Sequence, residues 1–238
     1  MKQDKLQIGF SIERLRSYEI LCPSKSEQEI IGAYHWNLLI CQSLYPFLHS
    51  AEIALRNGIH RAIIDKYKNE NWFSFVVKGK KSTKILEDLN KELSRKGYNK
   101  VDDTVAALTF GFWVNLLKEK TYRDQFNEHR LWPDLIPAVF PRYDRSAGGD
   151  DRKQIYQRLE EIKLLRNRLF HHEPIWKFKN SSTANDSIVE LRKKFNDVYK
   201  AIGWMSKSKQ EYLRQFGFVD FFKQNCTAEM LEIYKSKF

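Results

Sequence analysis

The sequence contains few cysteines, which cross-link a chain, and few glycines and prolines, which form its turns. Its 238 residues include three cysteines, and this odd number, without any Cys-x-x-Cys pair, indicates neither a disulfide framework nor a zinc site. Cys22 and Cys41 lie in or near apolar stretches, which favours unreactive thiols over nucleophiles. Ten glycines and six prolines are few for an all-β protein, which needs many tight turns.

Several functional motifs are also absent. The sequence has no P-loop, no Gly-x-Ser-x-Gly turn and no Gly-x-Gly-x-x-Gly between a strand and a helix. Its adjacent acidic pairs would point to different faces of a helix and so make poor metal clamps; they are Asp102-Asp103, Asp150-Asp151 and Glu160-Glu161. We therefore expect neither a metal nor a cofactor.

Apolar segments of membrane-spanning length are lacking as well. No hydrophobic run approaches the length of a bilayer span, and the N-terminal Met-Lys-Gln-Asp lacks the apolar segment of a secretory signal. No basic amphipathic helix with a clean apolar face is present, which argues against a membrane-surface protein. The sequence predicts a cytoplasmic protein that does not bind membranes.

Positive charge is what the sequence has in excess. Lys and Arg number 41 against 30 Asp and Glu, so the formal net charge is +11 and the pI is near 9.4. Such a surplus captures polyanions, which makes nucleic acid the first candidate partner and an anionic membrane the second. Each local basic group taken alone is more typical of a solvated face. Arg142, Arg145, Arg152 and Lys153 form one of these groups. The candidate RNA contacts are Lys78, Lys80, Lys81, Arg142, Arg145 and Arg168.

Apolar periodicity predicts an all-α fold. Apolar residues recur at spacings of three and four over residues 26–67, which predicts a long helix that Pro46 kinks or splits. A helix over 104–120 is apolar nearly all round and so predicted to be central and buried, with Asp102 or Asp103 as its N-cap. Further helices are expected over 82–95, 151–172, 187–205, 208–215 and 219–234.

The stretch from Arg166 to Pro174 concentrates the residues with chemical potential. It reads Arg-Asn-Arg-Leu-Phe-His-His-Glu-Pro at the end of a predicted helix. Histidine titrates near neutral pH and suits proton transfer, and arginine offers a planar fork to phosphate. Together they could cleave RNA without a metal: a base takes the 2′-hydroxyl proton, that oxygen attacks phosphorus, and an acid protonates the leaving 5′-oxygen. DNA lacks the attacking hydroxyl, so the chemistry predicts an RNA-specific site.

Helix geometry raises one difficulty for this site. Asn167 and His171 lie about 40° apart around a helix and share a face, whereas Arg166 and His171 lie roughly 140° apart. A shared site then requires a long arginine that wraps round, a distorted last turn, or a second copy of the chain in a two-fold dimer. The plainer interpretation is a helix end whose polar side chains cap carbonyls and bind water.

A second group of polar residues occurs earlier in the chain. Glu52, Arg56 and His60 recur every four residues on one predicted helix face, with Asn57 beside Arg56. An ordinary pairing of helix neighbours, Glu52 with Arg56, is the favoured interpretation. The functional interpretation makes Glu52, Arg56, Asn57 and His60 a supporting shell that orients the later motif.

Three blocks of the sequence resemble a known family. They are residues 34–60, which include Ala-Glu-Ile-Ala-Leu-Arg-Asn-Gly-Ile-His, residues 108–115, Leu-Thr-Phe-Gly-Phe-Trp-Val-Asn, and residues 165–176, Leu-Arg-Asn-Arg-Leu-Phe-His-His-Glu-Pro-Ile-Trp. In this order they are similar to the Abi-like (abortive infection) proteins of bacteria, in the HEPN superfamily. The resemblance implies one HEPN-like helical bundle over residues 1–238, with its core at about 30–176 and additional C-terminal helices at 187–238.

The resemblance also implies a function. Members carry an arginine followed, after four to six residues, by a histidine, in ribonucleases that need no metal. Arg166 with His171 fits at four intervening residues and His172 at five; His171 is preferred because Asn167 follows the arginine in the common form. The implied protein is a homodimeric endoribonuclease toxin of phage defence or of a toxin–antitoxin pair, restrained by an antitoxin protein or a small structured RNA.

A non-catalytic alternative stays open at this point. Some members of such superfamilies keep the fold and only bind RNA. The same basic surface could hold a structured small RNA, with an affinity that falls steeply as salt rises.

Overall fold

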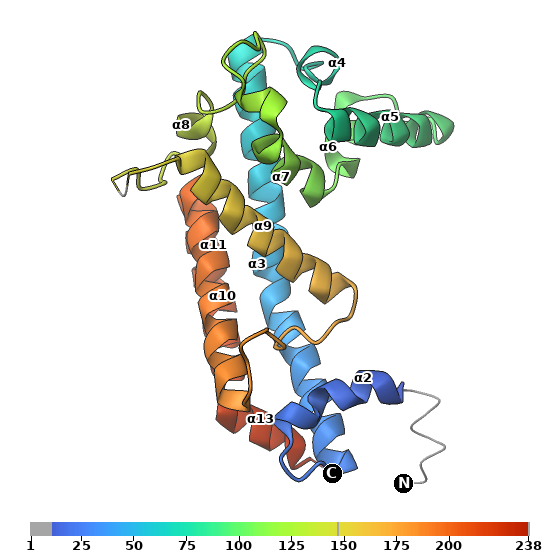
Figure 1. Ribbon diagram of the computed structural model, residues 1–238, viewed down its shortest axis with the longest axis vertical. Coiled ribbons are helices and arrows are strands. Elements are labelled where there is room, and N and C mark those ends of the chain that lie inside the picture. The colour runs from blue at the N-terminus through green and yellow to red at the C-terminus, as the bar shows by residue number, and fades with distance from the viewer. Residues whose placement is uncertain (1–10, 147, 238) are drawn as a thin grey trace. The chain divides into compact units, whose positions relative to one another are not determined.

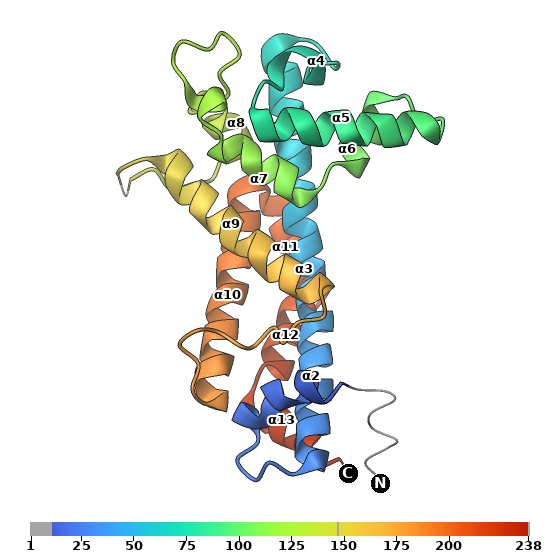
Figure 2. The same cartoon turned by 45° about the vertical axis from the view of Figure 1, so that its right-hand side comes forward.

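The computed structural model describes residues 11–146 and 148–237, and throughout these residues the regular structure is helical (Figures 1 and 2). Twelve α-helices and two short 3₁₀ helices are connected by turns and loops, and the described residues contain no strand. The prediction of an all-α fold is therefore confirmed. The N-terminal residues that entered the prediction of a cytoplasmic protein lie outside the described residues.

The chain divides into two compact units. Unit 1 comprises the described residues up to Leu48, Leu165–Tyr199 and the described residues from Glu211, and unit 2 comprises His49–Leu164 and Lys200–Gln210. The C-terminal region, predicted as an extension over 187–238, does not form a unit of its own, because it contributes to both.

Unit 1 holds its helices together through aromatic side chains. Phe195 stacks on Phe222 with ring centroids 4.1 Å apart, and Phe47 meets Phe195 edge-on at 4.8 Å, so α3, α10 and α12 share one core (Figure 2). The buried Trp36 indole donates to the carbonyl of Asn225 at 3.0 Å. This unit contains α2 (Ile12–Arg16), η1 (Ser17–Leu21), the first part of α3 (Glu27–Tyr67), the end of α9 (Asp151–Phe170), most of α10 (Ala184–Met205), the end of α11 (Lys207–Gln215), α12 (Phe218–Asn225) and α13 (Ala228–Lys235).

Unit 2 is built around the buried helix α7. Trp113 of α7 packs against Trp72 at 6.2 Å, and the Trp132 indole donates to the carbonyl of Leu116 at 2.7 Å. Glu119 accepts the backbone N–H of Ser82 at 3.1 Å and so caps α5, which lies beside α6 (Figure 1). The unit contains the second part of α3, α4 (Phe73–Val76), α5 (Lys80–Arg95), α6 (Val101–Ala107), α7 (Phe110–Lys118), η2 (Lys120–Arg123), α8 (Ile136–Val139), the start of α9, the end of α10 and the start of α11.

Pro46 does not split the long helix. α3 runs from Glu27 to Tyr67 as one element with the proline inside it. Proline removes one backbone hydrogen bond, but the residues around it, Leu44, Phe47 and Leu48, are fully buried. Their burial holds the helix together across the missing bond, so the predicted alternative of a split helix is wrong.

The predicted helix over 104–120 is two helices. α6 ends at Ala107, Leu108 is extended, and α7 begins after Thr109, whose hydroxyl accepts the N–H of Phe112 at 3.4 Å. Asp103 lies inside α6, where its carboxylate accepts the N–H of Lys100 at 3.0 Å, so the N-cap is Lys100 and the prediction of Asp102 or Asp103 is wrong. The burial predicted for the apolar segment is confirmed for α7 but not for Ala106 and Ala107 of α6, which are exposed.

The C-terminal helices follow the prediction with one further break. α10 and α11 match the predicted 187–205 and 208–215 within three residues at each end. The predicted helix over 219–234 is interrupted at Thr227, whose hydroxyl accepts the N–H of Met230 at 3.0 Å and starts α13.

Candidate functional site

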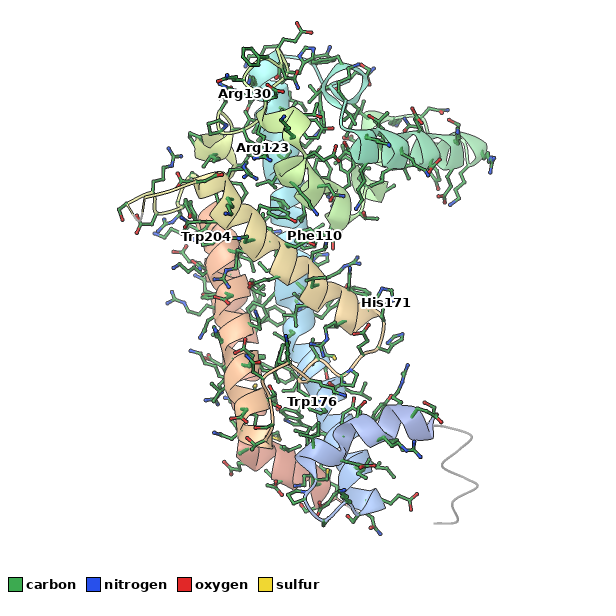
Figure 3. All side chains as sticks on the ribbon, viewed as in Figure 1. Phe110, Arg123, Arg130, His171, Trp176 and Trp204 are labelled. Atoms are coloured by element: carbon green, nitrogen blue, oxygen red, sulfur yellow. The ribbon has the colours of Figure 1, made fainter. Side chains whose placement is uncertain are left out.

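The residues Arg166–His172, here called the α9 motif, are the last five residues of α9 and the two that follow it, and they lie in unit 1 (Figure 3). The N–H of Glu173 donates to the carbonyl of Arg168 at 2.9 Å, and the N–H of His172 donates to the carbonyl of Leu169 at 3.1 Å. These two bonds form a Schellman C-cap, in which one residue must be left-handed. That residue is His172, with φ of 58°, at a position that glycine usually occupies.

His171 and His172 differ in backbone role although both side chains are exposed. The N–H of His171 still makes a helical bond to the carbonyl of Asn167 at 2.8 Å, so His171 belongs to the last helical turn. His172 has the strained, left-handed backbone, and at this residue the chain turns away from the axis of α9. Asn167, the third predicted catalytic residue, is half-buried one turn before His171.

Arg166 extends toward the end of the helix. Its guanidinium carbon lies 4.3 Å from the centroid of the Phe170 ring, one turn further along and next to His171 in the chain. A long arginine that wraps round is one of the three solutions that helix geometry left open. The contact places the guanidinium on Phe170, which precedes His171 in the chain but lies about 100° from it around the helix, so this contact alone does not join Arg166 to His171.

Arg168 has a structural position in the same turn. It donates to the carbonyl of Pro174, forms an ion pair with Glu173 at 3.6 Å and lies over the Phe178 ring at 5.4 Å. Burial lowers the pKa of its guanidinium from the ordinary value, while Glu173 acts in the opposite direction. Arg168 therefore fastens the segment after α9 to the helix, and its contact with RNA stays a prediction.

Packing onto α3 fixes the segment that follows the motif. The side-chain oxygen of Asn37 accepts the N–H of Ile175 at 2.9 Å, and the buried Trp176 packs against Tyr18 with centroids 5.5 Å apart (Figure 3). Two anchors thus follow within five residues of His171, and the end of α9 has a defined place in unit 1.

The second constellation lies in unit 2 and is engaged there. His60 accepts the Trp72 indole N–H through Nδ1 at 2.9 Å, and Arg56 donates to the carbonyl of Ala106 at 3.2 Å. Burial lowers the pKa of His60. Glu52 is half-buried and Asn57 exposed. Their role as a supporting shell for the α9 motif stays a prediction.

Apart from Arg168, the predicted RNA contacts lie on unit 2. Lys78, Lys80 and Lys81 are exposed around the start of α5, and Arg142 and Arg145 are exposed in the loop before α9. The grouping of Arg152 with that loop is wrong. Its side chain is buried, where it donates to the carbonyl of Leu117 at 2.9 Å and pairs with Asp150 at 2.9 Å.

The three cysteines carry thiols of low reactivity. Burial raises the pKa of Cys22 and Cys41 to about 11 and that of Cys226 to about 12. Thiols with such pKa values stay protonated near neutral pH, and the thiolate is the nucleophilic form.

A cavity of about 350 Å³ lies in unit 2, apart from every predicted catalytic residue. Its lining is mostly neutral amide, hydroxyl and apolar groups, and it comprises Asn71, Phe73, Ser74, Leu86, Asn90, Leu93, Ser94, Tyr98, Asn99, Lys100, Val101 and Thr104. Within residues 11–146 and 148–237, no group of three or more His, Cys, Asp or Glu side chains is placed to hold a metal ion.

By length and composition, α3 is long and apolar enough to cross a membrane. This finding differs from the expectation that no hydrophobic run approaches the length of a bilayer span. Half of the relevant window is buried within the protein, and core helices pass the same test. The predicted cytoplasmic location stays a prediction.

Two features of the motif were missed by sequence reasoning, namely the contact of Arg166 with Phe170 and the left-handed backbone of His172. The spacing of four between Arg166 and Phe170 was the available signal for the first, since such residues are neighbours on a helix. The pair of histidines directly before Glu173-Pro174 gave no comparable signal for the second.

The chain was compared with protein-family models, with curated proteins and with solved structures. No family model, no curated protein and no solved structure matches it.

Proposed function

We propose that this protein is a metal-independent endoribonuclease whose catalytic residues are Arg166 and His171. The observation that carries the proposal is the end of α9, where an exposed histidine follows directly on the ring that holds an arginine guanidinium at 4.3 Å. A proton-transfer group and a phosphate-binding group occur in the same helical turn. The net charge of +11 supports a polyanionic substrate.

In the proposed reaction His171 accepts the proton of a 2′-hydroxyl group. The 2′-oxygen forms a bond to the adjacent phosphorus as the bond from phosphorus to the 5′-oxygen breaks, and an acid delivers a proton to that oxygen. Arg166 stabilises the charge that develops on the phosphoryl oxygens. The products are a 2′,3′-cyclic phosphate and a 5′-hydroxyl. One histidine per chain can supply only the base or the acid, so we propose a homodimer in which a second copy supplies the other.

A bacterial phage-defence or toxin–antitoxin setting is the biological part of the proposal. It rests on the sequence blocks that resemble the Abi-like family, and it would make the protein a HEPN-type toxin held inactive by an antitoxin or by a small structured RNA. The asparagine of the motif, Asn167, is the third residue assigned to the catalytic group.

The test is RNA cleavage by purified protein in excess EDTA. Wild type should cleave structured RNA to cyclic-phosphate and 5′-hydroxyl ends, and His171→Ala should reduce the rate by at least about a hundredfold, as expected for loss of a general acid–base group. His172→Asn should retain most of the activity, because asparagine tolerates the left-handed backbone and only the imidazole is removed.

Other outcomes would overturn the proposal in distinct ways. Full activity of His171→Ala with loss of activity in His172→Asn would move the chemistry to His172. Tight, salt-sensitive RNA binding without cleavage by wild type would favour a non-catalytic RNA-binding protein.

A further inference from the structure

A small cavity lies in unit 1 between α10 and α12. Its volume is about 300 Å³, which is at the lower end of the range of ligand-binding pockets. It is lined by Arg192, Phe195 and Asn196 of α10 and by Phe222 and Lys223 of α12. The lining thus combines two aromatic rings, two cations and one amide, and none of these five described residues carries a carboxylate.

Packing fixes the aromatic part of this lining. Phe195 and Phe222 stack with ring centroids 4.1 Å apart and an angle of 11° between the planes, and their exposed fractions are 2% and 0%. Phe47 of α3 meets Phe195 edge-on at 4.8 Å and supports it from within the unit. Because close-packed rings keep one position, the buried side of the cavity is a preformed apolar surface. Such a surface can bind an apolar group without first being ordered.

Both cations of the lining are exposed and can still bind an anion. The Nε of Arg192 donates to the carbonyl of Cys226 at 2.9 Å, which holds the guanidinium in place. Within residues 11–146 and 148–237, the terminal nitrogens of Arg192 have no hydrogen bond or ion pair, and neither does the ammonium of Lys223. Asp220 precedes Lys223 by about one helical turn on α12, yet these two described residues form no ion pair. The cavity therefore has two cationic groups with free N–H donors.

This lining matches the two ends of an amphipathic anion. The buried rings and the alkyl stems of Arg192 and Lys223 can cover an apolar chain, while their charged ends contact an acidic group. A nucleotide matches less well, because its ribose hydroxyls need polar partners and Asn196 is the one neutral polar residue among those that line the cavity. An uncharged apolar molecule would leave both cations without a partner.

We propose that the cavity between α10 and α12 binds a small organic acid with a hydrocarbon chain. The chain lies against Phe195 and Phe222, and the carboxylate contacts Arg192 and Lys223. None of these residues belongs to the α9 motif, and the inference does not depend on the proposed ribonuclease function.

The first experiment compares sodium octanoate with octanamide. The two probes have the same alkyl chain and differ in the charge of the head group. Titrations of the full-length protein, followed by saturation-transfer NMR of the probe, give both affinities. Wild type should bind octanoate about tenfold more tightly than octanamide, as expected for hydrogen bonds to a charged group.

Two variants then place the binding in this cavity. Lys223→Gln removes one cation of the lining and should weaken octanoate binding about tenfold while leaving octanamide binding unchanged. Asn196→Phe places a ring at the cavity and should block both probes. Both original side chains are exposed, so thermal melting of the two variants should match that of wild type.

A matched control comes from the same helix as Arg192. Lys193 follows Arg192 on α10, does not line the cavity and pairs with Glu190 at 3.8 Å. Lys193→Gln removes the same charge from the protein as Lys223→Gln does, so it should bind octanoate as wild type does. A loss in Lys223→Gln alone would therefore reflect a local contact rather than the net charge of the chain.

Several results would overturn the proposal. They are the absence of saturable octanoate binding, equal affinities of wild type for octanoate and octanamide, and octanoate binding that survives Asn196→Phe. A hairpin RNA that displaces octanoate from wild type and binds more weakly to Asn196→Phe would also overturn it, because the cavity would then belong to a nucleic-acid surface. RNA cleavage by wild type bears on none of these results, so the nuclease and the acid-binding site can fail separately.

Discussion

Two stretches of this chain begin with arginine and asparagine and end in histidine. The first, Arg56 to His60, lies within α3 in unit 2, and the second, Arg166 to His171, ends α9 in unit 1. In the first, the histidine accepts a hydrogen bond from the Trp72 indole, and burial lowers its pKa. In the second, the histidine is exposed at the point where the helix stops.

This difference follows from the position of each stretch in its helix. A histidine in the middle of a helix that packs on both sides is covered by neighbouring elements and must satisfy its ring nitrogens within the protein. A histidine at the end of a helix has no following turn to cover it, and His171 is exposed there. The same residue types therefore serve packing in α3 and are available for chemistry in α9.

The largest expected effect compares the two arginines. Arg166→Lys should lower the single-turnover rate of RNA cleavage by roughly a hundredfold, because lysine lacks the planar fork that stacks on Phe170 and that we propose contacts phosphate. Arg56→Lys should leave the rate nearly unchanged, because an ammonium group can still donate to the carbonyl of Ala106. Rapid-quench kinetics on one RNA substrate, with thermal melting of both variants, would measure the contrast.

A strong rate loss in Arg56→Lys would break the comparison. It would show that the α3 constellation supports the reacting groups, which is the supporting role that the sequence left open for Glu52, Arg56, Asn57 and His60. Equal, unaffected rates in both variants would remove Arg166 from the proposed mechanism.

The next effect is a pH dependence of stability that originates in α3. Burial holds the pKa of His60 below its ordinary value of 6.5, with Arg61 acting in the same direction and Asp102 and Glu70 opposing. As the pH falls, the imidazole of His60 therefore binds a proton at a higher pH in the unfolded chain than in the folded chain. The contribution of His60 to stability is fully present above about pH 6.5 and is lost as the pH falls through the depressed pKa.

Urea unfolding of wild type and His60→Gln between about pH 7.5 and pH 5 tests this sign. Glutamine retains an oxygen acceptor for the Trp72 indole but does not titrate, so the variant should lose less stability on acidification than wild type. Identical losses in the two proteins would mean that His60 does not require its neutral form.

The helices themselves were largely predictable because their apolar stripes are long. α3, α5 and α9 each keep an apolar face in register over several turns, and a pattern of that length specifies a helix. The breaks at Thr109 and Thr227 were not predictable in the same way. At each break one threonine hydroxyl accepts a backbone N–H at the start of a new helix, and at Thr109 the surrounding run stays apolar on both sides.

The residues of the candidate site could be predicted from the sequence, but their geometry could not. The α9 motif is a continuous stretch of sequence, so Arg166, Asn167 and His171 could be named without a structure. The ring beneath the guanidinium and the aromatic neighbour Tyr45 depend on side-chain packing between α9 and α3. The choice between the two adjacent histidines depends on their backbone dihedral angles, and the sequence does not distinguish these because both residues are histidine.

The smallest effect tests that choice directly. His172 has φ of 58°, which costs a side-chain-bearing residue about 1 to 2 kcal/mol relative to glycine. Glycine loses more backbone entropy on folding, by roughly 0.5 to 1 kcal/mol, so His172→Gly should stabilise the protein by a net amount of roughly 0.5 to 1 kcal/mol. His171→Gly should destabilise it, because His171 still belongs to the last helical turn through its bond to Asn167.

Urea unfolding measures both changes, and RNA cleavage by the same proteins gives the second half of the comparison. If the strained residue serves only the turn, His172→Gly is more stable than wild type and equally active. A variant that is more stable and inactive would show that the strain holds an imidazole needed for cleavage, and His172 would then replace His171 as the proton-transfer group.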